Sequence, residues 1–586
     1  MGRSRKLCRN YEERGVEFVP QSHQSFLAEY MFNNPDLRGI LLYHGLGSGK
    51  TCSAILIADL IRKYVMGSKR HFRPIKGGRR YSRGKLFEGI TEDNFRVVVF
   101  SPGSLRQNFI SEYCEFCGIN REDFEEMFDF YSYNYSKIDQ TLPDSLDNTL
   151  IIVDEVHNLI NGTRNESKTF LSIYNKIFES KNTKIILLSG TPLVTYPVEL
   201  AYIVNILKPK TFNIEKFSRY IVEDEENGDI TIVNEKSLRK KIRGCISFVK
   251  GFDEKFYPEV IRAKIHKIPM SDYQLGWYRN ARVEEMDMIR KNKEDLERLK
   301  KTNYRKYVQI RTQMYLAWSM MKSRQRSNFA YPKYIQNVLE KKLSPKMKEQ
   351  IVKELPPDKL EEDGGWIDLK VIAKLKNKYS PKFAKIVKNI LMLSGKHACY
   401  TYYKSHFGVH LLQALVKACG HESLIFSGDL DDAGRRSILD KFNSPENTMG
   451  EKYKVLFFTQ AGIEGLTLLA VRHFHIVESD NNESDIQQAI GRVVRYKSHN
   501  MLPIDQRNVT IHRYFSVDRG DAVEIAIAKK TGKKTIDEKD ETYLKEMKFP
   551  QPKASDELAY EYGKKRLRGL REIYRIMQEE AIDTIK

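Results

Sequence analysis

The chain has 586 residues, of which 41% are hydrophobic, so it is long enough for about three or four domains with globular cores. Its formal net charge of +21 makes nucleic acid the leading partner, although composition alone does not separate a nucleic-acid-binding protein from a merely basic one. The seven cysteines are odd in number and scattered, which argues against a disulfide framework and favours a reducing compartment. Cys114 and Cys117 have no second pair nearby, so half-buried helix cysteines are favoured over a zinc site.

The N-terminus and the apolar runs give no sign of a membrane protein. Residues 1–6 contain no apolar signal core, and Lys6 breaks the pattern for N-myristoylation. No apolar run approaches the length of a membrane span. We therefore expect a soluble, intracellular protein with no membrane partner.

Strand candidates alternate with helical lengths in two regions of the chain. In the first, about 20–250, they are Gly39–Tyr43, Arg96–Ser101, Thr149–Val153 and Lys184–Ser189. In the second, about 380–515, they are His397–Tyr402, Ser423–Phe426, Lys454–Thr459, Phe474–Glu478 and Val509–Tyr514. Apolar, β-branched runs in this arrangement predict two parallel α/β sheets.

A glycine-rich turn follows the first strand candidate and precedes a helix-like segment, Cys52–Lys63. In this context backbone N–H groups and a helix N-terminus hold phosphates. Lys50 is expected to reach the β- and γ-phosphates of ATP, and the Thr51 hydroxyl is expected to hold Mg²⁺. His44 stands where the phosphate-loop pattern has its first glycine. The cofactor-binding candidates here are His44, Gly45, Leu46, Gly47, Ser48, Gly49, Lys50 and Thr51.

The stretch Met66–Gly89 is rich in lysine, arginine and glycine. In a parallel α/β unit this connection lies at the sheet edge away from the phosphate site, so we do not expect it on the main nucleic-acid track. A secondary phosphate contact, an acidic protein partner and a simply solvated loop all stay open.

Two further motifs follow strand candidates of the first region. Ile151–His157 is an apolar run followed by two carboxylates, which is typical of a Walker B strand. Asp154 is expected to hold Mg²⁺ through water, and Glu155 to orient or deprotonate the attacking water. Ser189–Pro192 carries hydroxyls that could link the nucleotide site to a nucleic-acid site. Each motif is weak alone, but their order after the glycine turn is strong evidence.

Two motifs of the second region complete the set. Thr459–Leu466 contributes Gly462 and Glu464 as cofactor-binding candidates. On a helix, Gln488, Arg492 and Arg495 would share one face at i, i+4 and i+7. A charged face alone is usually solvated, but here it would place two guanidinium groups across a cleft from the triphosphate, where they neutralise charge developing on the γ-phosphoryl group. The catalytic candidates are Lys50, Asp154, Glu155, Gln488, Arg492 and Arg495.

The remaining blocks have a different pattern. Residues 255–375 read as mostly helical, and Met286–Lys306 is typical of a solvated helix. From about 520 the chain again reads as helical. An apolar stripe there is formed by Leu567, Leu570, Tyr574, Met577 and Ala581. The stripe favours a helix that docks on its own chain over a site for a partner.

Taken in order, these motifs resemble those of superfamily 2 helicase-type ATPases over most of residues 20–515. The resemblance implies an α/β fold class: two RecA-like parallel-sheet domains with ATP between them, a helical insertion and a helical C-terminal segment. It also implies that Gln24 reads the adenine. Strand contacts would come from Ser101, Pro102, Ser104 and Arg106. The corresponding segments are 1–250 (N-terminal ATP-binding domain), 251–375 (mostly helical linker), 376–520 (C-terminal helicase domain) and 521–586 (helical end).

The subtype is similar to Swi/Snf-type double-strand translocases, on the evidence of Ser189–Pro192 and Ala461–Leu466, and differs from DEAD-box RNA helicases. Several shorter sequence motifs resemble those of the nucleoside triphosphatase I and early transcription factor small subunit family of poxviruses and other large cytoplasmic DNA viruses. These short motifs are Cys245–Phe248 leading to Tyr257-Pro258, Arg324–Phe329, Tyr379–Lys382, Ser498–Pro503 and the ending Ala581–Asp583. The early glycine turn and this ending predict a chain near full length.

The resemblance implies DNA-dependent ATP hydrolysis in virus-encoded transcription, at initiation, elongation or termination. ATP and Mg²⁺ would be the cofactors. Double-stranded DNA and subunits of a viral RNA polymerase or transcription factor would be the partners, in the virion and the host cytoplasm. An RNA helicase that acts on transcripts stays open as an alternative. So does an ATP-binding scaffold without motor activity, although the intact set of catalytic candidates argues against it.

Overall fold

The computed structural model describes residues 22–34, 36–45, 48–65, 96–103, 106, 109–110, 128–133, 138–224, 228–250, 256–302, 320–331, 359–362, 365–368, 377–404, 406–460, 466–518 and 553–584. The chain forms two compact units, and each is described by itself. Unit 1 comprises residues 1–256 and 565–586, and unit 2 comprises residues 257–564. The division into four segments drawn from the sequence stays a prediction.

Unit 1 is built around a six-stranded sheet in which every neighbouring pair is parallel. In sheet order the strands are β3 (Phe128–Ser132), β2 (Arg96–Ser101), β4 (Thr149–Val153), β5 (Lys184–Ser189), β1 (Gly39–His44) and β8 (Ile246–Val249). The four strands predicted in this region are confirmed. The sequence analysis assigns no strand to β3 or β8, the short strands at the two edges of the sheet.

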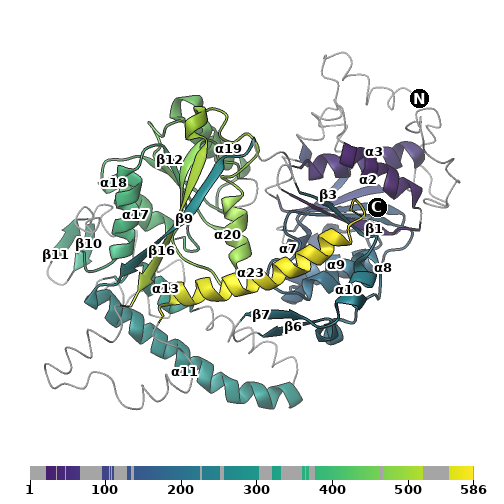
Figure 1. Ribbon diagram of the computed structural model, residues 1–586, viewed down its shortest axis with the longest axis horizontal. Coiled ribbons are helices and arrows are strands. Elements are labelled where there is room, and N and C mark those ends of the chain that lie inside the picture. Colours follow the sequence, from purple (N-terminus) through teal and green to yellow (C-terminus); the bar gives the residue numbers. More distant parts are fainter. Residues whose placement is uncertain are drawn as a thin grey trace. The chain divides into compact units, whose positions relative to one another are not determined.

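Helices cover both faces of this sheet, because side chains of a strand alternate between its faces. Ile40 and Leu42 of β1 belong to a core shared with α2 (Ser22–Asn33) and α3 (Lys50–Val65). Leu41 belongs to the core on the other face. The helices of that core are α7 (Val156–Arg164), α8 (Lys168–Glu179), α9 (Glu199–Leu207), α10 (Glu235–Ile242) and part of α23 (Ser555–Glu579) (Figure 1). Smaller elements are α6 (Ile138–Thr141), a 3₁₀ turn (Ile214–Arg219) and the hairpin β6 (Ile221–Asp224) and β7 (Asp229–Ile232).

Unit 2 contains a second six-stranded sheet, and its neighbouring pairs are again all parallel. In sheet order the strands are β13 (Ser423–Phe426), β14 (Val455–Phe458), β12 (Lys396–Tyr400), β15 (Val471–Ile476), β16 (Asn508–Val517) and β9 (Glu259–Pro269). The strands predicted in this region are confirmed within a few residues at their ends. Two sheets of this kind, flanked by helices, match the RecA-like α/β class expected from the sequence.

The helices of unit 2 also lie on two faces of their sheet. Cys399 of β12 packs in one core with α17 (Pro381–Met392) and α18 (Val409–Ala418). Its neighbour Ala398 packs in the other core with α19 (Asp432–Asn443) and α20 (Glu483–Ile490). The remaining elements are α11 (Asp272–Thr302), α13 (Met321–Asn328), the pair β10 (Lys359–Glu362) and β11 (Gly365–Asp368), and 3₁₀ turns at Pro445–Asn447 and Ile504–Gln506.

Strand β9 lies in a block that the sequence analysis reads as mostly helical. It pairs with β16 over its whole length and forms an edge of the sheet. Its side chains are mostly exposed, and basic residues alternate with apolar ones such as Val260 and Ile265. A half-solvated edge strand lacks the continuous apolar run of a buried parallel strand, which is why the pattern does not reveal it.

The C-terminal helix α23 confirms the prediction that its apolar stripe docks on the chain itself. Leu570, Tyr574, Met577 and Ala581 are all buried in the unit 1 core. By residue number the helix begins in unit 2 and continues into unit 1.

Two regions named from the sequence, the basic stretch 66–89 and the pair Cys114 and Cys117, lie outside the described residues. Within the described part of the chain, no helix combines the length and the apolar character that crossing a membrane requires.

Candidate nucleotide-binding site

The carboxyl ends of the central strands of unit 1 lie along one edge of the sheet. The register pairs Tyr43 with Ser189, Leu187 with Val153, and Val153 with Phe100. The glycine turn after β1, the carboxylates after β4 and the hydroxyls after β5 therefore gather at the same edge. In open α/β sheets this edge is where ligands bind.

The glycine turn joins the end of β1 to the start of α3 at Lys50. Gly49 has φ of +72°, and a Cβ atom there would lie 2.8 Å from Gln24 Nε2. The backbone angle favours glycine at this position, and a side chain there would also displace the Gln24 amide. The Ser48 hydroxyl donates to the Gly45 carbonyl at 2.7 Å, which closes the turn. Leu46 and Gly47 lie outside the described residues.

The ammonium group of Lys50 lies over the turn. Its Nζ donates to the carbonyls of His44 at 3.1 Å and Gly45 at 3.3 Å. Thr51 is the second residue of α3, at the end of the helix whose dipole favours anions. Lysine charge, helix N-terminus and glycine turn are thus assembled in one place, as the sequence predicts.

Helix α2 brings Gln24 to this turn. The Gln24 side chain is buried, and its Nε2 donates to the Gly49 carbonyl at 3.3 Å. The adjacent His23 places Nε2 3.2 Å from the Ser48 carbonyl, and burial lowers its pKa. Sequence reasoning named Gln24 but missed His23, whose position beside Gln24 is the one available indication.

His44 occupies the position of the first glycine of the phosphate-loop pattern, and its side chain packs in the interior. Its ring is fully buried, and Nε2 lies 2.8 Å from the Ser247 hydroxyl on β8. Burial, helped by the nearby charges of His23 and Lys50, lowers the pKa of His44 to about 3. The imidazole is therefore neutral and braces β1 against β8, while its backbone carbonyl faces Lys50.

Asp154 and Glu155 follow β4 in a constrained conformation. Asp154 Oδ1 accepts the Glu155 N–H at 2.9 Å, and the Tyr133 hydroxyl donates to the Asp154 carbonyl at 3.2 Å. Glu155 has φ of 47° and ψ of 54°, which is the left-handed region. For a residue other than glycine this costs about 1–3 kcal/mol, and such strain gathers at functional sites.

His157 connects the ends of β4 and β5. Its Nδ1 is 3.0 Å from the Ser189 hydroxyl and 3.4 Å from Glu155 Oε2. Ser189 Oγ also accepts the Thr191 N–H at 3.1 Å. The Ser189–Pro192 motif is thus in contact with the residue predicted to be the catalytic base, through a histidine that the sequence analysis does not single out.

The arginine motif of unit 2 differs from its prediction in one respect. Helix α20 ends at Ile490, with Gly491 as its C-cap, so Arg492 and Arg495 do not share a helix face with Gln488. The backbone continues in tight turns, in which the Arg492 N–H donates to Ala489 at 3.1 Å. Glycine is a poor helix former and common at helix ends, which explains the early stop.

The segment that carries Arg492 and Arg495 does contact the chain that follows the motif Thr459–Leu466. Arg492 is buried, and its carbonyl accepts the Leu468 N–H at 3.0 Å. Arg495 donates to the Thr467 hydroxyl. The arginines therefore lie against the chain that continues from Leu466. Gly462 and Glu464 lie outside the described residues.

The segment after β2 was predicted to contact a nucleic-acid strand. Ser101 is buried, and its hydroxyl donates to the carbonyl of Pro102 at 3.2 Å. The Arg106 guanidinium lies 5.4 Å from the centre of the Phe130 ring. Ser104 lies outside the described residues.

Comparison with known families gives two matches. The SNF2-related domain matches residues 11–315, and the helicase conserved C-terminal domain matches residues 381–497. The first match covers more than half of the chain and includes the whole edge at which the candidate residues gather.

Several related proteins are viral. A protein of Acanthamoeba polyphaga mimivirus that carries the name of an ATP-dependent RNA helicase is 26% identical, over 85% of this chain and 82% of the relative. Nucleoside triphosphatase I of Choristoneura fumiferana entomopoxvirus is 25% identical, over 85% and 73% of the two chains. The termination factor NPH-I homolog of African swine fever virus is 23% identical, over 84% and 73%.

Proposed function

The chain belongs to the SNF2-related family of helicase-type ATPases, and we propose that it is a DNA-dependent ATPase that moves along duplex DNA during viral transcription. Membership of the family supports ATP hydrolysis, and the DNA track and the role in transcription are our proposal. The observation that carries it is the gathering of Lys50, Asp154, Glu155 and Ser189 at one carboxyl edge of a parallel sheet.

Nucleotide binding would use the turn and the helix that follows it. Backbone N–H groups of the turn and the α3 N-terminus would hold the phosphates, and Lys50 would neutralise the β- and γ-phosphates. Gln24, which touches the turn, would read the adenine. The hydroxyl of Thr51 and the carboxylate of Asp154 are hard oxygen donors, which suit Mg²⁺. When bound, the ion would neutralise phosphate charge as hydrolysis proceeds.

Hydrolysis would depend on Glu155 as the base for the attacking water. Its left-handed backbone and its contact with His157 restrict where the carboxylate can lie. Arg492 and Arg495 of unit 2, with Gln488, would act on the charge that develops at the γ-phosphate, as the resemblance implies. A group of this kind acts mainly on the transition state rather than on ATP binding.

The choice of DNA rests on charge and on relatives. A net charge of +21 favours phosphate contacts, which predict steep salt dependence and little sequence preference. The entomopoxvirus triphosphatase and the swine fever virus termination factor are similar over most of the chain. On this basis we propose that the protein acts together with subunits of a viral RNA polymerase or transcription factor, in the virion and the host cytoplasm.

One alternative has a specific observation in its favour. The mimivirus relative that carries an RNA helicase name covers as much of the chain as the triphosphatase does. An RNA helicase that acts on transcripts is therefore the second candidate.

The test compares ATPase rates without nucleic acid and with single-stranded DNA, double-stranded DNA or RNA, with Glu155→Gln as the blank. We expect strong stimulation by DNA, little by RNA, and turnover in the blank lower by about 10²–10⁴. Stimulation mainly by RNA would transfer the protein to the second candidate. Partner binding without hydrolysis under any condition would indicate a scaffold.

A further inference from the structure

The loop that follows Ser189–Pro192 is held by the C-terminal helix. The Tyr574 hydroxyl of α23 accepts the Leu193 N–H at 3.2 Å and donates to the Leu193 carbonyl. One buried side chain thus satisfies both backbone groups of the residue directly after the motif. The contact joins positions 381 residues apart in the sequence.

Arg566, two turns earlier on the same helix, holds the other end of this loop. Its Nε donates to the Thr195 carbonyl at 2.5 Å, and its guanidinium forms an ion pair with Glu223. The guanidinium also lies 4.5 Å from the centre of the Tyr196 ring. Arg164, at the end of α7, lies 3.8 Å from the same ring, so Tyr196 contacts two cations.

The N–H groups of residues 194–196 are bonded by a side chain of α9. The buried carboxylate of Glu199 accepts the N–H groups of Val194 at 2.7 Å, Thr195 at 3.1 Å and Tyr196 at 2.9 Å. The N–H groups of residues 194–196 are therefore held by α9, whereas both backbone groups of Leu193 and the Thr195 carbonyl are held by α23. Ser189, at the start of the motif that precedes this loop, lies 3.0 Å from His157 Nδ1.

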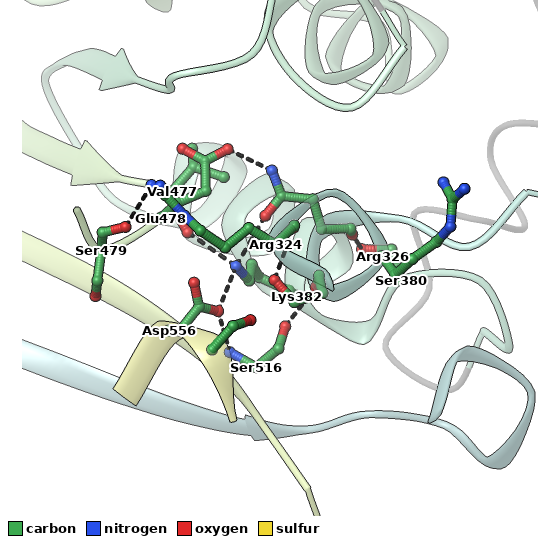
Figure 2. Close-up of polar contacts among 12 residues, drawn as sticks. Arg324, Arg326, Ser380, Lys382, Val477, Glu478, Ser479, Ser516 and Asp556 are labelled. Carbon is green, nitrogen blue, oxygen red and sulfur yellow. Dashed lines mark hydrogen bonds and ion pairs between the residues drawn. The ribbon is translucent and has the colours of Figure 1, made fainter. Parts of the chain in front are cut away.

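Helix α23 also has buried polar contacts where it begins, in unit 2. Asp556 and Lys382 form an ion pair of 2.8 Å in which both side chains are fully buried. Figure 2 shows that Lys382 also reaches the Val477 carbonyl, at 3.1 Å, and that Asp556 accepts the Ser516 N–H, at 2.8 Å. Lys382 Nζ donates further to Asn328 Oδ1 at 2.9 Å. Lys382 thus bonds to Asn328, Val477 and Asp556, and Asp556 accepts its bonds from Lys382 and Ser516 through Oδ2.

We propose that Tyr574 and Arg566 are positioning residues for ATP hydrolysis, which hold the loop 193–196 and thereby set Ser189 and His157 beside Glu155. The inference rests on the proposed ATPase function and adds to it a role for the C-terminal helix.

The test is Tyr574→Phe, which removes one hydroxyl and keeps the ring in the core. Its matched control is Tyr174→Phe, because Tyr174 is buried in the same core and its hydroxyl donates to the Tyr202 carbonyl at 3.2 Å, away from the loop. Three quantities are compared: kcat and KM for nucleic-acid-stimulated ATPase, thermal midpoint, and hydrogen–deuterium exchange of peptides covering residues 189–196.

We expect kcat of Tyr574→Phe to fall between about fivefold and a hundredfold, since small misplacements near a reacting centre are costly, while KM for ATP stays unchanged. Exchange in 189–196 should become faster in this variant and stay at the wild-type rate in the control, although both lose similar thermal stability. Equal kcat and equal exchange in the two variants would overturn the inference.

This outcome is separate from failure of the proposed function. If wild-type protein showed no ATPase activity with any nucleic acid, the function would fail, whereas the exchange measurement would still report whether Tyr574 holds the loop. Arg566→Lys gives a second test of the proposal, because lysine keeps the charge but cannot reproduce the guanidinium geometry. We expect it to reduce kcat as well, and an unchanged kcat would count against Arg566 as a positioning residue.

Discussion

The carboxyl edges of the two sheets share an architecture but use their polar residues differently. In unit 1, Lys50, Asp154 and Ser189 gather at the edge where β1, β4 and β5 end. In unit 2, Glu478 follows β15 at the corresponding edge, but it is buried and bonded by its own chain: the Thr401 hydroxyl donates at 2.6 Å and the Tyr402 N–H at 3.0 Å. Burial raises the pKa of Glu478, and the nearby Lys382 partly offsets this effect.

The comparison teaches that convergence of polar side chains at a sheet edge is not sufficient to define a site. Polar groups at the edge of unit 2 bond to one another, and Figure 2 shows Arg324, Lys382, Glu478 and Asp556 among them. These contacts account for two of the short motifs named in the sequence analysis, Arg324–Phe329 and Tyr379–Lys382. Arg324 donates to the Ser479 carbonyl at 2.6 Å, Asn328 donates to Glu478, and Lys382 joins Asn328 to Asp556.

The largest expected effect comes from breaking this network. Asp556→Ala would leave the Lys382 charge buried without its anion, and we expect the free energy of unfolding of unit 2 to fall by about 3–5 kcal/mol. The measurement is urea denaturation followed by tryptophan fluorescence, because Trp277, Trp318 and Trp366 all belong to unit 2.

The control is Glu557→Ala, the adjacent position, whose partner Lys267 is 63% exposed. A pair whose cation is this exposed to solvent contributes about 0–1 kcal/mol, so this variant should unfold nearly as wild type does. The double variant Asp556→Ala with Lys382→Met should recover part of the loss, since no charge then stays unpaired. Equal losses for Asp556→Ala and Glu557→Ala would contradict the buried network.

A histidine cluster also distinguishes unit 2 from unit 1. It spans four adjacent strands and consists of His397 on β12, His473 and His475 on β15, His512 on β16 and His266 on β9. Burial is the main cause that lowers the pKa of each, to about 4 for His473 and about 3 for His512. Among the described residues these rings form no cluster suited to a metal ion.

Hydrogen bonds in the cluster fit neutral rings. His397 Nε2 lies 3.2 Å from the Leu393 carbonyl, to which it must donate, so His397 Nδ1 accepts from His475 Nε2 at 2.8 Å. His475 Nδ1 then accepts from the Tyr514 hydroxyl at 2.8 Å, and this hydroxyl accepts from Asn389 at 2.7 Å. An added proton on His397 Nδ1 would place a donor against the His475 Nε2–H donor.

Acid should therefore destabilise unit 2. A histidine whose folded pKa is lowered contributes stability that is present above its unfolded pKa, near 6.5, and lost as pH falls toward the folded value. We expect the tryptophan signal to report loss of stability between pH 6.5 and about 4, before exchange protection is lost in the strands of unit 1. Constant stability of unit 2 across this range, or earlier loss in unit 1, would contradict the assignment of neutral rings.

A smaller effect is expected from the close packing of α23 in unit 2. A Cβ at Gly563 would lie 2.6 Å from the Asp480 carbonyl oxygen, whereas a Cβ at Gly276 in α11 would meet nothing within 4 Å. Gly563→Ala should cost about 1–3 kcal/mol by overpacking, and Gly276→Ala should be neutral or slightly stabilising. Thermal unfolding of the two variants checks this, and equal midpoints would mean that the helix adapts without cost.

Much of the fold could be predicted from the sequence, because buried parallel strands are continuous apolar runs and the motifs follow them directly. The edge strands β3, β8 and β9 were missed since they are short or half-exposed. The end of α20 was missed because the spacing of Gln488 and Arg492 suggested a helix that Gly491 stops.

Pairings distant in sequence could not be predicted at all. Periodicity shows that Tyr574 is buried, but not that its hydroxyl meets Leu193. His44 looks like a defect in a glycine motif until Ser247 on β8 is seen beside it. Burial can be read locally, whereas partners depend on the topology that brings elements together.

The most direct test of the account is a single-turnover measurement of ATP hydrolysis by Arg495→Ala at saturating DNA, together with its ATP affinity. If unit 1 binds the nucleotide and the unit 2 arginines act on the transition state, the hydrolysis rate should fall by about 10³ or more while ATP affinity changes little. Arg495→Lys should fall less, since it keeps the charge. A large loss of ATP affinity with an unchanged hydrolysis rate would contradict this division of labour between the units.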